Sequence, residues 1–263
     1  MSDNWPAALE DAHAKVERVD ELGDELLRGI REFIVTDPVG VVEELDPTSG
    51  DRLVKIKLLR PMPRRLQTIT GDVLTNLRSA LDYLAGELHL KHCKKRGKVY
   101  FPFAKSRDAF LRQTEKELEN NFGAHAAEEF KRVEPYPGGN DLLHALHETR
   151  NVDSHNFLVP LSTEGTLAFA RYINVANAKV GFKIPKPGRL DEGLVISNLG
   201  TSGTFSFSDG GASGANLGSV GASIEMAFGD IPMLKGRPVI GTLVAMQKEV
   251  TGVLERFHSE FSQ

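Results

Sequence analysis

Hydrophobic residues recur every three or four positions along the first part of the chain, and the residues between them are mostly charged. The recurring positions are Leu9, Val16, Val19, Leu26, Ile30 and Phe33. This spacing predicts one amphipathic helix over about residues 6 to 34, with a single buried face. Asp37-Pro38 ends it, because a proline disfavours helical conformation in the residue before it.

Two short runs rich in β-branched residues follow, from Val39 to Leu45 and from Arg52 to Leu59. Between them lies Asp46-Pro47-Thr48-Ser49-Gly50-Asp51, a segment made of residues that favour turns. The pattern predicts a β-hairpin over about residues 39 to 59. The partial alternation from Leu53 to Leu58 predicts that the second strand buries one face.

The longest apolar stripe of the chain runs from Pro63 to about Lys95. It consists of Leu66, Ile69, Val73, Leu77, Ala80, Leu81, Leu84 and Leu88. A continuous stripe of this length predicts a helix in the core of a bundle. Basic residues crowd its last turns and Gly97 follows, which is the charge and capping pattern expected at a helix C-terminus.

Three shorter helical stretches complete the first part of the chain. We predict them over about residues 106 to 118, 123 to 133 and 141 to 155. Pro135-Tyr136-Pro137-Gly138-Gly139 separates the last two. Either Asn140 or Asp141 suits the N-cap of the final stretch, since both carry a short side-chain oxygen acceptor.

From Thr166 onward the pattern changes to β. The predicted strands are Leu167 to Val175, Val180 to Ile184, Leu194 to Ser197, Thr204 to Ser208 and Ala222 to Phe228. The Gly/Ser-rich tract from Gly200 to Gly221 predicts a mobile loop or a hairpin excursion, because it has little to bury. Pro238 suits a first helical position and begins a last amphipathic helix.

These elements predict an α+β fold. Residues 1–160 form an antiparallel helical bundle that carries the inserted β-hairpin. Residues 161–263 form a β-rich segment with the Gly/Ser-rich loop and a C-terminal helix that packs on the bundle.

Composition narrows the possible partners and compartments. The net charge of the 263 residues is −4, so no global field draws the protein to nucleic acid or to anionic lipid, and any RNA site must be local. Cys93 is the only cysteine, which excludes an internal disulfide and a zinc site with two thiolates. The sequence shows no signal-peptide pattern and no apolar run of spanning length, so we expect a cytoplasmic protein without membrane contact.

The helix predicted from Asp141 has two unlike faces. One face carries Leu142, Ala145, Leu146, Thr149 and Val152, and the opposite face carries His144, His147, Asn151 and His155. Solvent-facing stripes usually hold Lys and Glu, whereas imidazoles exchange protons near neutral pH. The stripe is therefore a candidate active site, and a solvated surface face is the alternative.

Arg150 and His155 bracket four residues, and Asn151 directly follows the arginine. This arrangement resembles the Arg-x4-His signature of HEPN domains, a helical-bundle superfamily with many metal-independent ribonucleases. The resemblance implies that the arginine, the polar residue after it and the histidine gather at a cleft, often between two protomers. It therefore implies RNA as a partner, a homodimer and no cofactor.

The chemistry of RNA cleavage suits these residue types. Cleavage without a metal needs a base for the 2′-hydroxyl, an acid for the leaving oxygen and a fixed cation for the phosphoryl oxygens. His155 suits the base or the acid, Arg150 suits the phosphate clamp, Asn151 suits a positioning role, and His147 completes the candidate catalytic set. The leading hypothesis is a metal-independent endoribonuclease or a ribonuclease-like effector.

A second resemblance covers most of residues 60 to 160 and concerns a recurrent family of uncharacterised bacterial and phage proteins. The segments that carry it are Asn76-Leu77-Arg78-Ser79-Ala80-Leu81-Asp82-Tyr83-Leu84, Phe101-Pro102-Phe103, Pro135-Tyr136, and His147-Glu148 to Asn151-x-Asp153-x-His155. That family usually carries aspartate where Arg150 stands. It also has a basic pair around the histidine, where this chain has Ser154 and Asn156.

Further polar positions are candidates for supporting roles. Asp72, Asn76, Ser79 and Tyr83 form a polar stripe on the long helix, and with His144 they suit residues that orient His155 or His147. The basic run Lys91, Lys94, Lys95 and Arg96 suits RNA phosphates, and helix-end complementation is the alternative.

Two other function classes remain open. One is a non-catalytic interaction protein whose β-rich region docks a protein partner. The other is a metal-assisted hydrolase built on His144, His147 and His155, although helix-borne metal sites usually add a carboxylate. His89, His92 and Cys93 share a helix face as a further metal candidate, and a structural role is the alternative. Glycine loops for phosphates and nucleophile elbows are absent from the sequence.

Overall fold

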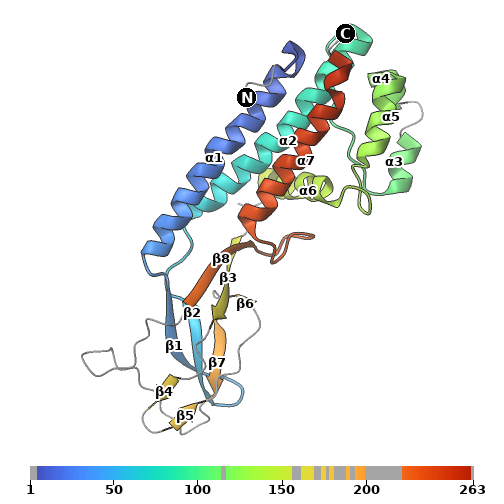
Figure 1. Cartoon of the computed structure of the whole chain (residues 1–263). Coiled ribbons are helices and arrows are strands. Elements are labelled where there is room, and N and C mark those ends of the chain that lie inside the picture. The colour runs from blue at the N-terminus through green and yellow to red at the C-terminus, as the bar shows by residue number, and fades with distance from the viewer. Residues whose placement is uncertain are drawn as a thin grey trace. The chain divides into compact units, whose positions relative to one another are not determined.

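The computed structural model of the chain describes residues 5–113, 117–155, 161–168, 173–175, 178–180, 188–189, 193–198 and 221–261. It is a mostly helical α+β fold with long packed helices, a small three-stranded antiparallel sheet and a C-terminal helix (Figure 1). The chain divides into two compact units. The helical unit comprises Met1–Gly29, Arg64–Pro160 and Asp230–Gln263, and the β unit comprises Ile30–Pro63 and Leu161–Gly229.

Three long helices dominate the helical unit and run alongside one another (Figure 1). They are α1 (Glu10–Val35), preceded by the short 3-10 turn η1 (Ala7–Leu9), α2 (Arg64–Cys93) and α7 (Val239–Phe261). The shorter helices are α3 (Arg107–Gln113), α4 (Glu119–Phe122), α5 (Ala124–Val133) and α6 (Asp141–His155). The predicted helices are thus present, except that the stretch predicted over about 106 to 118 is described as α3 only up to Gln113, and that the separate short α4 was not predicted. Helix α7 packs against α2, α5 and α6.

The apolar stripe of α2 forms the centre of the helical core. Its members are Leu66, Ile69, Val73, Leu77, Ala80, Leu81, Leu84 and Leu88, all buried. Burying one such leucine stabilises the fold by about 1.5–3 kcal/mol. Gly29 allows α1 to approach this stripe closely, because a Cβ atom there would lie only 2.6 Å from Leu66 Cδ2.

The predicted β-hairpin is present in the β unit. Strand β1 (Val39–Leu45) pairs antiparallel with β2 (Arg52–Leu58), from Val39 opposite Leu58 to Leu45 opposite Arg52. The backbone N–H of Thr48 donates to Asp46 Oδ1 at 2.8 Å, which closes the turn. Strand β2 also pairs with β7 (Leu194–Asn198), so the hairpin groups with strands after residue 160 and not with the helices.

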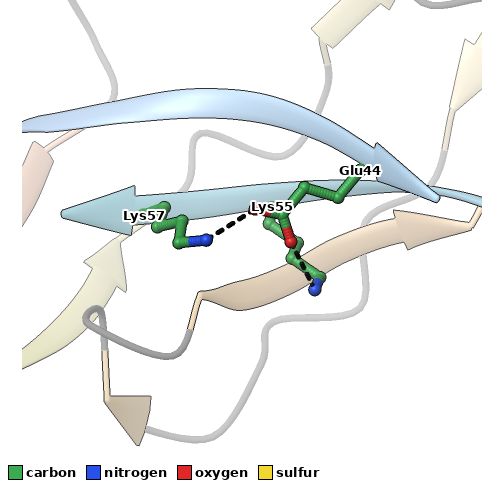
Figure 2. A network of polar contacts seen from close by, with 3 residues as sticks. All are labelled: Glu44, Lys55 and Lys57. Carbon is green, nitrogen blue, oxygen red and sulfur yellow. Dashed lines mark hydrogen bonds and ion pairs between the residues drawn. The ribbon is translucent and has the colours of Figure 1, made fainter. Parts of the chain in front are cut away.

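An acidic residue joins two lysines across this hairpin. Figure 2 shows Glu44 of β1 accepting hydrogen bonds from Lys55 at 2.8 Å and from Lys57 at 2.6 Å. The hydrogen bond from Lys55, and then that from Lys57, lower the pKa of Glu44 to about 2. The three charges form a partly exposed cross-strand network that favours this register of the pair.

The remaining described strands form a second three-stranded sheet and one two-stranded pair in the β unit. Strand β3 (Leu161–Ala168) lies between β6 (Gly188–Arg189) and β8 (Gly221–Phe228), and β4 (Ile173–Val175) pairs with β5 (Ala178–Val180). The predicted strand start at Leu167 is wrong, because β3 already begins at Leu161. The predicted strand from Thr204 to Ser208 and most of the Gly/Ser-rich tract lie outside the described residues.

The structure decides between the two predicted caps at the start of α6 and differs from the prediction at the end of α2. Asn140 is the side-chain cap of α6, since its Oδ1 accepts the backbone N–H of Leu143 at 3.0 Å. The left-handed residue after α2 is Lys94, with φ of 57°, and not Gly97 as predicted. Among the described residues no helix is long and apolar enough to cross a membrane.

Gly97 has a packing role in place of a capping role. A Cβ atom there would lie 2.4 Å from Nε2 of His89, a buried side chain whose Nδ1 lies 3.0 Å from the carbonyl oxygen of Asn121. The chain after α2 can therefore lie against His89 only where residue 97 lacks a side chain.

We predict that Gly97→Ala lowers the free energy of unfolding by about 1–3 kcal/mol, because the added methyl group must displace His89. Gly86→Ala is the matched control: a Cβ atom added at Gly86 would have no atom within 4 Å, and alanine in a helix interior stabilises by about 0.5–1 kcal/mol. Urea denaturation of both variants measures the difference. Equal stability of the two variants would contradict the packing role.

Candidate functional site

His147 lies on α6 with its ring stacked on Phe103, a residue of the extended segment between α2 and α3. The two ring centroids are 4.4 Å apart and the planes differ by 8°. His147 is partly exposed. Phe103 therefore holds the imidazole plane in one orientation at the edge of the core.

A guanidinium from α2 fixes the position of this imidazole. Arg78 Nε donates a hydrogen bond to His147 Nδ1 at 3.3 Å, and its Cζ lies 4.7 Å from the centroid of Phe103. The residue is only 7% exposed and forms an ion pair with Asp82, one helical turn away. Asp82 in turn accepts the backbone N–H of Phe101 at 2.9 Å. These contacts join α2, the 101–103 segment and α6.

The contact with Arg78 determines which nitrogen of His147 carries the proton. A guanidinium only donates hydrogen bonds, so Nδ1 must present its lone pair and the proton of the neutral ring lies on Nε2. The amide Nδ2 of Asn151 lies 3.2 Å from Nε2. In this tautomer Nε2–H needs an acceptor, so it donates to Asn151 only when the amide group is turned to present Oδ1 in place of Nδ2.

His147 is neutral at physiological pH. Burial, followed by the charges of Arg78, His144 and Arg150, lowers its pKa from 6.5 to about 4. A second proton on the ring would point Nδ1–H at the Nε–H of Arg78. This geometry therefore disfavours the doubly protonated imidazole, as the nearby positive charges do. The ring is thus a fixed hydrogen-bond donor through Nε2.

Besides Oγ1 of Thr149, two polar groups of α6 are buried without a hydrogen-bond partner among the described residues. The Nε–H of Arg150 and the Nδ1 of His144 have no hydrogen-bond partner among the described residues, and His144 is 7% exposed. Buried polar groups are almost always paired in native proteins, so such groups mark either strain or a ligand position. We call Arg78, Phe103, His147, Arg150 and Asn151 the His147 site.

The structure thus brings three of the predicted catalytic residues, His147, Arg150 and Asn151, to adjacent turns of α6. His155 is the last residue of this helix, and its side chain lies outside the described part. His144, predicted on the polar face opposite the packing face, is buried because α6 packs against both α2 and α7.

The α2 residues predicted to support the histidines have other surroundings. The side-chain amide of Asn76 donates to the backbone oxygen of Asp72 at 2.8 Å, and Tyr83 lies under the ammonium group of Lys15, 5.9 Å from its ring centroid. Arg78 and Asp82, one turn apart on the same helix, make the contacts around His147 instead.

The predicted basic run is exposed at the end of α2. Lys91 lies 5.6 Å above the ring of Phe261, Arg96 pairs with Glu87 at 3.8 Å, and Lys94 takes the left-handed position. Lys95 is exposed as well. These contacts are those of a helix C-terminus, where cations complement the dipole.

The described part of the chain holds no group of three or more His, Cys, Asp or Glu residues placed to bind a metal ion. His89 and Cys93 contact the carbonyl oxygen of Asn121, Cys93 through a long sulfur contact of 3.7 Å. Both residues thus connect the end of α2 to α4, which is a structural role.

Sequence reasoning missed the roles of Arg78, Asp82 and Phe103. A signal was present, because all three lie in segments that carried the resemblance to the bacterial and phage family, Asn76 to Leu84 and Phe101 to Phe103. Arg78 and His147 are 69 residues apart in the chain, and their hydrogen bond brings these segments and α6 to one place.

Comparisons of the chain with models of protein families, with curated proteins and with solved structures find no match.

The low pKa of His147 predicts a pH dependence of stability. Between pH 6.5 and about 4 the unfolded chain binds a proton at this residue that the folded chain does not, so folding loses stability as the pH falls through this range. Relative to His147→Gln, we expect wild type to lose on the order of 1 kcal/mol between pH 7.5 and pH 5, after allowance for solvent screening.

Denaturant unfolding of both proteins at each pH measures this loss, and subtracting the result for His147→Gln removes the contribution of the other histidines. An NMR titration of the His147 ring gives the pKa directly. A pKa near 6.5 for this ring would contradict the predicted surroundings.

Proposed function

We propose that the protein is a metal-independent ribonuclease whose His147 site binds the scissile phosphodiester of RNA. The observation that carries the proposal is a neutral imidazole held by a buried arginine, with the unpaired Nε–H of a second arginine beside it. Sites of this donor composition suit an anion with several acceptor oxygens.

The charges of the site favour a phosphate group. Asp82 forms an ion pair with Arg78, whereas Arg150 forms none among the side chains that the structure describes, and this guanidinium is the charge that the proposal assigns to the phosphate. The Nε2–H of His147 adds a neutral donor, and the amide of Asn151 can exchange its contact with the ring for one with a phosphoryl oxygen. The overall charge of −4 makes such a local site necessary for RNA binding.

The proposed cleavage is a transesterification. The 2′-oxygen of a ribose attacks the adjacent phosphorus, the bond from phosphorus to the 5′-oxygen breaks, and the products are a 2′,3′-cyclic phosphate and a 5′-hydroxyl. One proton leaves the 2′-hydroxyl and one proton is added to the 5′-oxygen. Charge on the non-bridging oxygens grows during this step, and Arg150 and His147 Nε2–H suit its stabilisation.

His147 is a poor proton acceptor, because Arg78 occupies the lone pair of Nδ1. The proposal therefore assigns the base to His155, which follows Arg150 at the spacing of the HEPN-like signature. A second protomer would supply a second copy of His155 and so the acid, which is why the proposal includes a homodimer.

One observation favours a second candidate, an RNA-binding protein without catalysis. Both ring nitrogens of His147 already have partners within the protein, Arg78 and the amide of Asn151. A histidine satisfied in this way can hold a phosphate without taking part in proton transfer.

We predict that wild type cleaves a mixed single-stranded RNA in the presence of a chelator. His155→Ala should lower the rate by about 100-fold or more, the usual contribution of an acid–base group. His125→Ala is the matched control, since this exposed histidine of α5 contacts Glu260 and lies outside the His147 site. Gel analysis measures the rates, and end-group analysis detects the cyclic phosphate.

Arg150→Gln separates the two candidates further. Loss of cleavage in His155→Ala with RNA affinity retained, and weaker affinity in Arg150→Gln, would support the ribonuclease. Intact RNA in every sample, with affinity that depends on Arg150, would support the binding protein. RNA neither bound nor cleaved would contradict both.

A further inference from the structure

A cavity of about 250 Å³ adjoins the His147 site in the helical unit. We call it the aromatic pocket. It is lined by Lys98, Val99, Tyr100, Pro102, Phe103, Phe110, Glu117, Leu118, Asn121 and Phe122. It thus lies among the segment after α2, α3, and residues 117–122 up to the end of α4, all within one compact unit.

The lining combines flat apolar walls with a few polar groups. Phe110 and Phe122 are buried, and Tyr100 is 58% exposed. Asn121 also lines the pocket, and its backbone oxygen lies 3.0 Å from Nδ1 of His89. Lys98 and Glu117 are exposed and add one charge of each sign. Such a composition suits a planar aromatic ligand whose edge carries donors and acceptors.

Phe103 belongs both to the aromatic pocket and to the His147 site. It lines the aromatic pocket, and its ring also stacks on His147 at 4.4 Å and lies 4.7 Å from Arg78 Cζ. A ligand in the aromatic pocket therefore contacts the same residue, Phe103, that stacks on His147. A nucleotide unit of RNA presents a flat ring next to an anionic group, which is the combination that the two neighbouring places suit.

We propose that the aromatic pocket binds one unstacked nucleobase of the RNA, next to the phosphate at the His147 site. This inference rests on the proposed function and names the part of the substrate that is recognised. The cavity volume is below the roughly 300–1,000 Å³ of common small-molecule sites, so it accommodates a single base without its sugar and phosphate. Base recognition by aromatic walls restricts the substrate to single-stranded RNA.

The test measures the affinity of a short single-stranded RNA that carries 2′-O-methyl groups, which remove the attacking hydroxyl and keep the RNA intact. A second oligonucleotide of equal length lacks its bases but keeps every phosphate. Fluorescence anisotropy gives the affinity of each for wild type, Tyr100→Ala and Tyr100→Phe. Because Tyr100 is largely exposed, both variants should fold, and circular dichroism checks this.

The expected result is a loss of about 5- to 100-fold in affinity for the base-containing RNA in Tyr100→Ala, the range of one base–aromatic stack. Tyr100→Phe should retain the wild-type affinity, because it keeps the ring. The base-free oligonucleotide should bind wild type and Tyr100→Ala equally.

Two results would overturn the inference, and they differ in what they say of the proposed function. If Tyr100→Ala binds the base-containing RNA as wild type does, the aromatic pocket takes no base while the phosphate site stands. If wild type binds neither oligonucleotide, the aromatic pocket and the phosphate site both fail.

Discussion

The hydrogen bond from Arg78 to His147 is the interaction on which the rest of the site depends. It leaves the proton of the neutral ring on Nε2, and it opposes a second proton on Nδ1. Asp82 holds the guanidinium from the other side and is itself held by the backbone N–H of Phe101. One chain of polar contacts thus sets the charge, the tautomer and the position of the imidazole.

Burying the guanidinium of Arg78 costs free energy unless its ion pair and hydrogen bonds are formed. A guanidinium that is 7% exposed loses much of its hydration, and removing one partner of a buried ion pair typically costs about 3–5 kcal/mol. The leucine stripe of α2 offsets this cost, because it anchors the same helix in the core. The packing of α2 therefore determines where Arg78 meets α6, and Phe103 fills the space between them.

Much of the fold could be predicted from local sequence pattern, whereas the contacts of Arg78, Asp82 and Phe103 around His147 could not. The helices, the hairpin and the candidate role of His147 follow from periodicity and residue type. Arg78 and Asp82 have the i,i+4 spacing of an ordinary surface pair, and nothing local in the sequence reveals that Arg78 is buried against α6. The same limit applies to Gly97, whose contact with His89 depends on the path of the chain after the helix.

The tautomer of His147 tests this account most directly. Nitrogen-15 chemical shifts of the imidazole at pH 7 distinguish a protonated nitrogen from one that presents its lone pair. The account predicts a neutral ring with the proton on Nε2 and a lone pair on Nδ1 facing Arg78, and a change in this pattern in Arg78→Met. A proton on Nδ1, or rapid exchange between the two neutral forms in wild type, would contradict it.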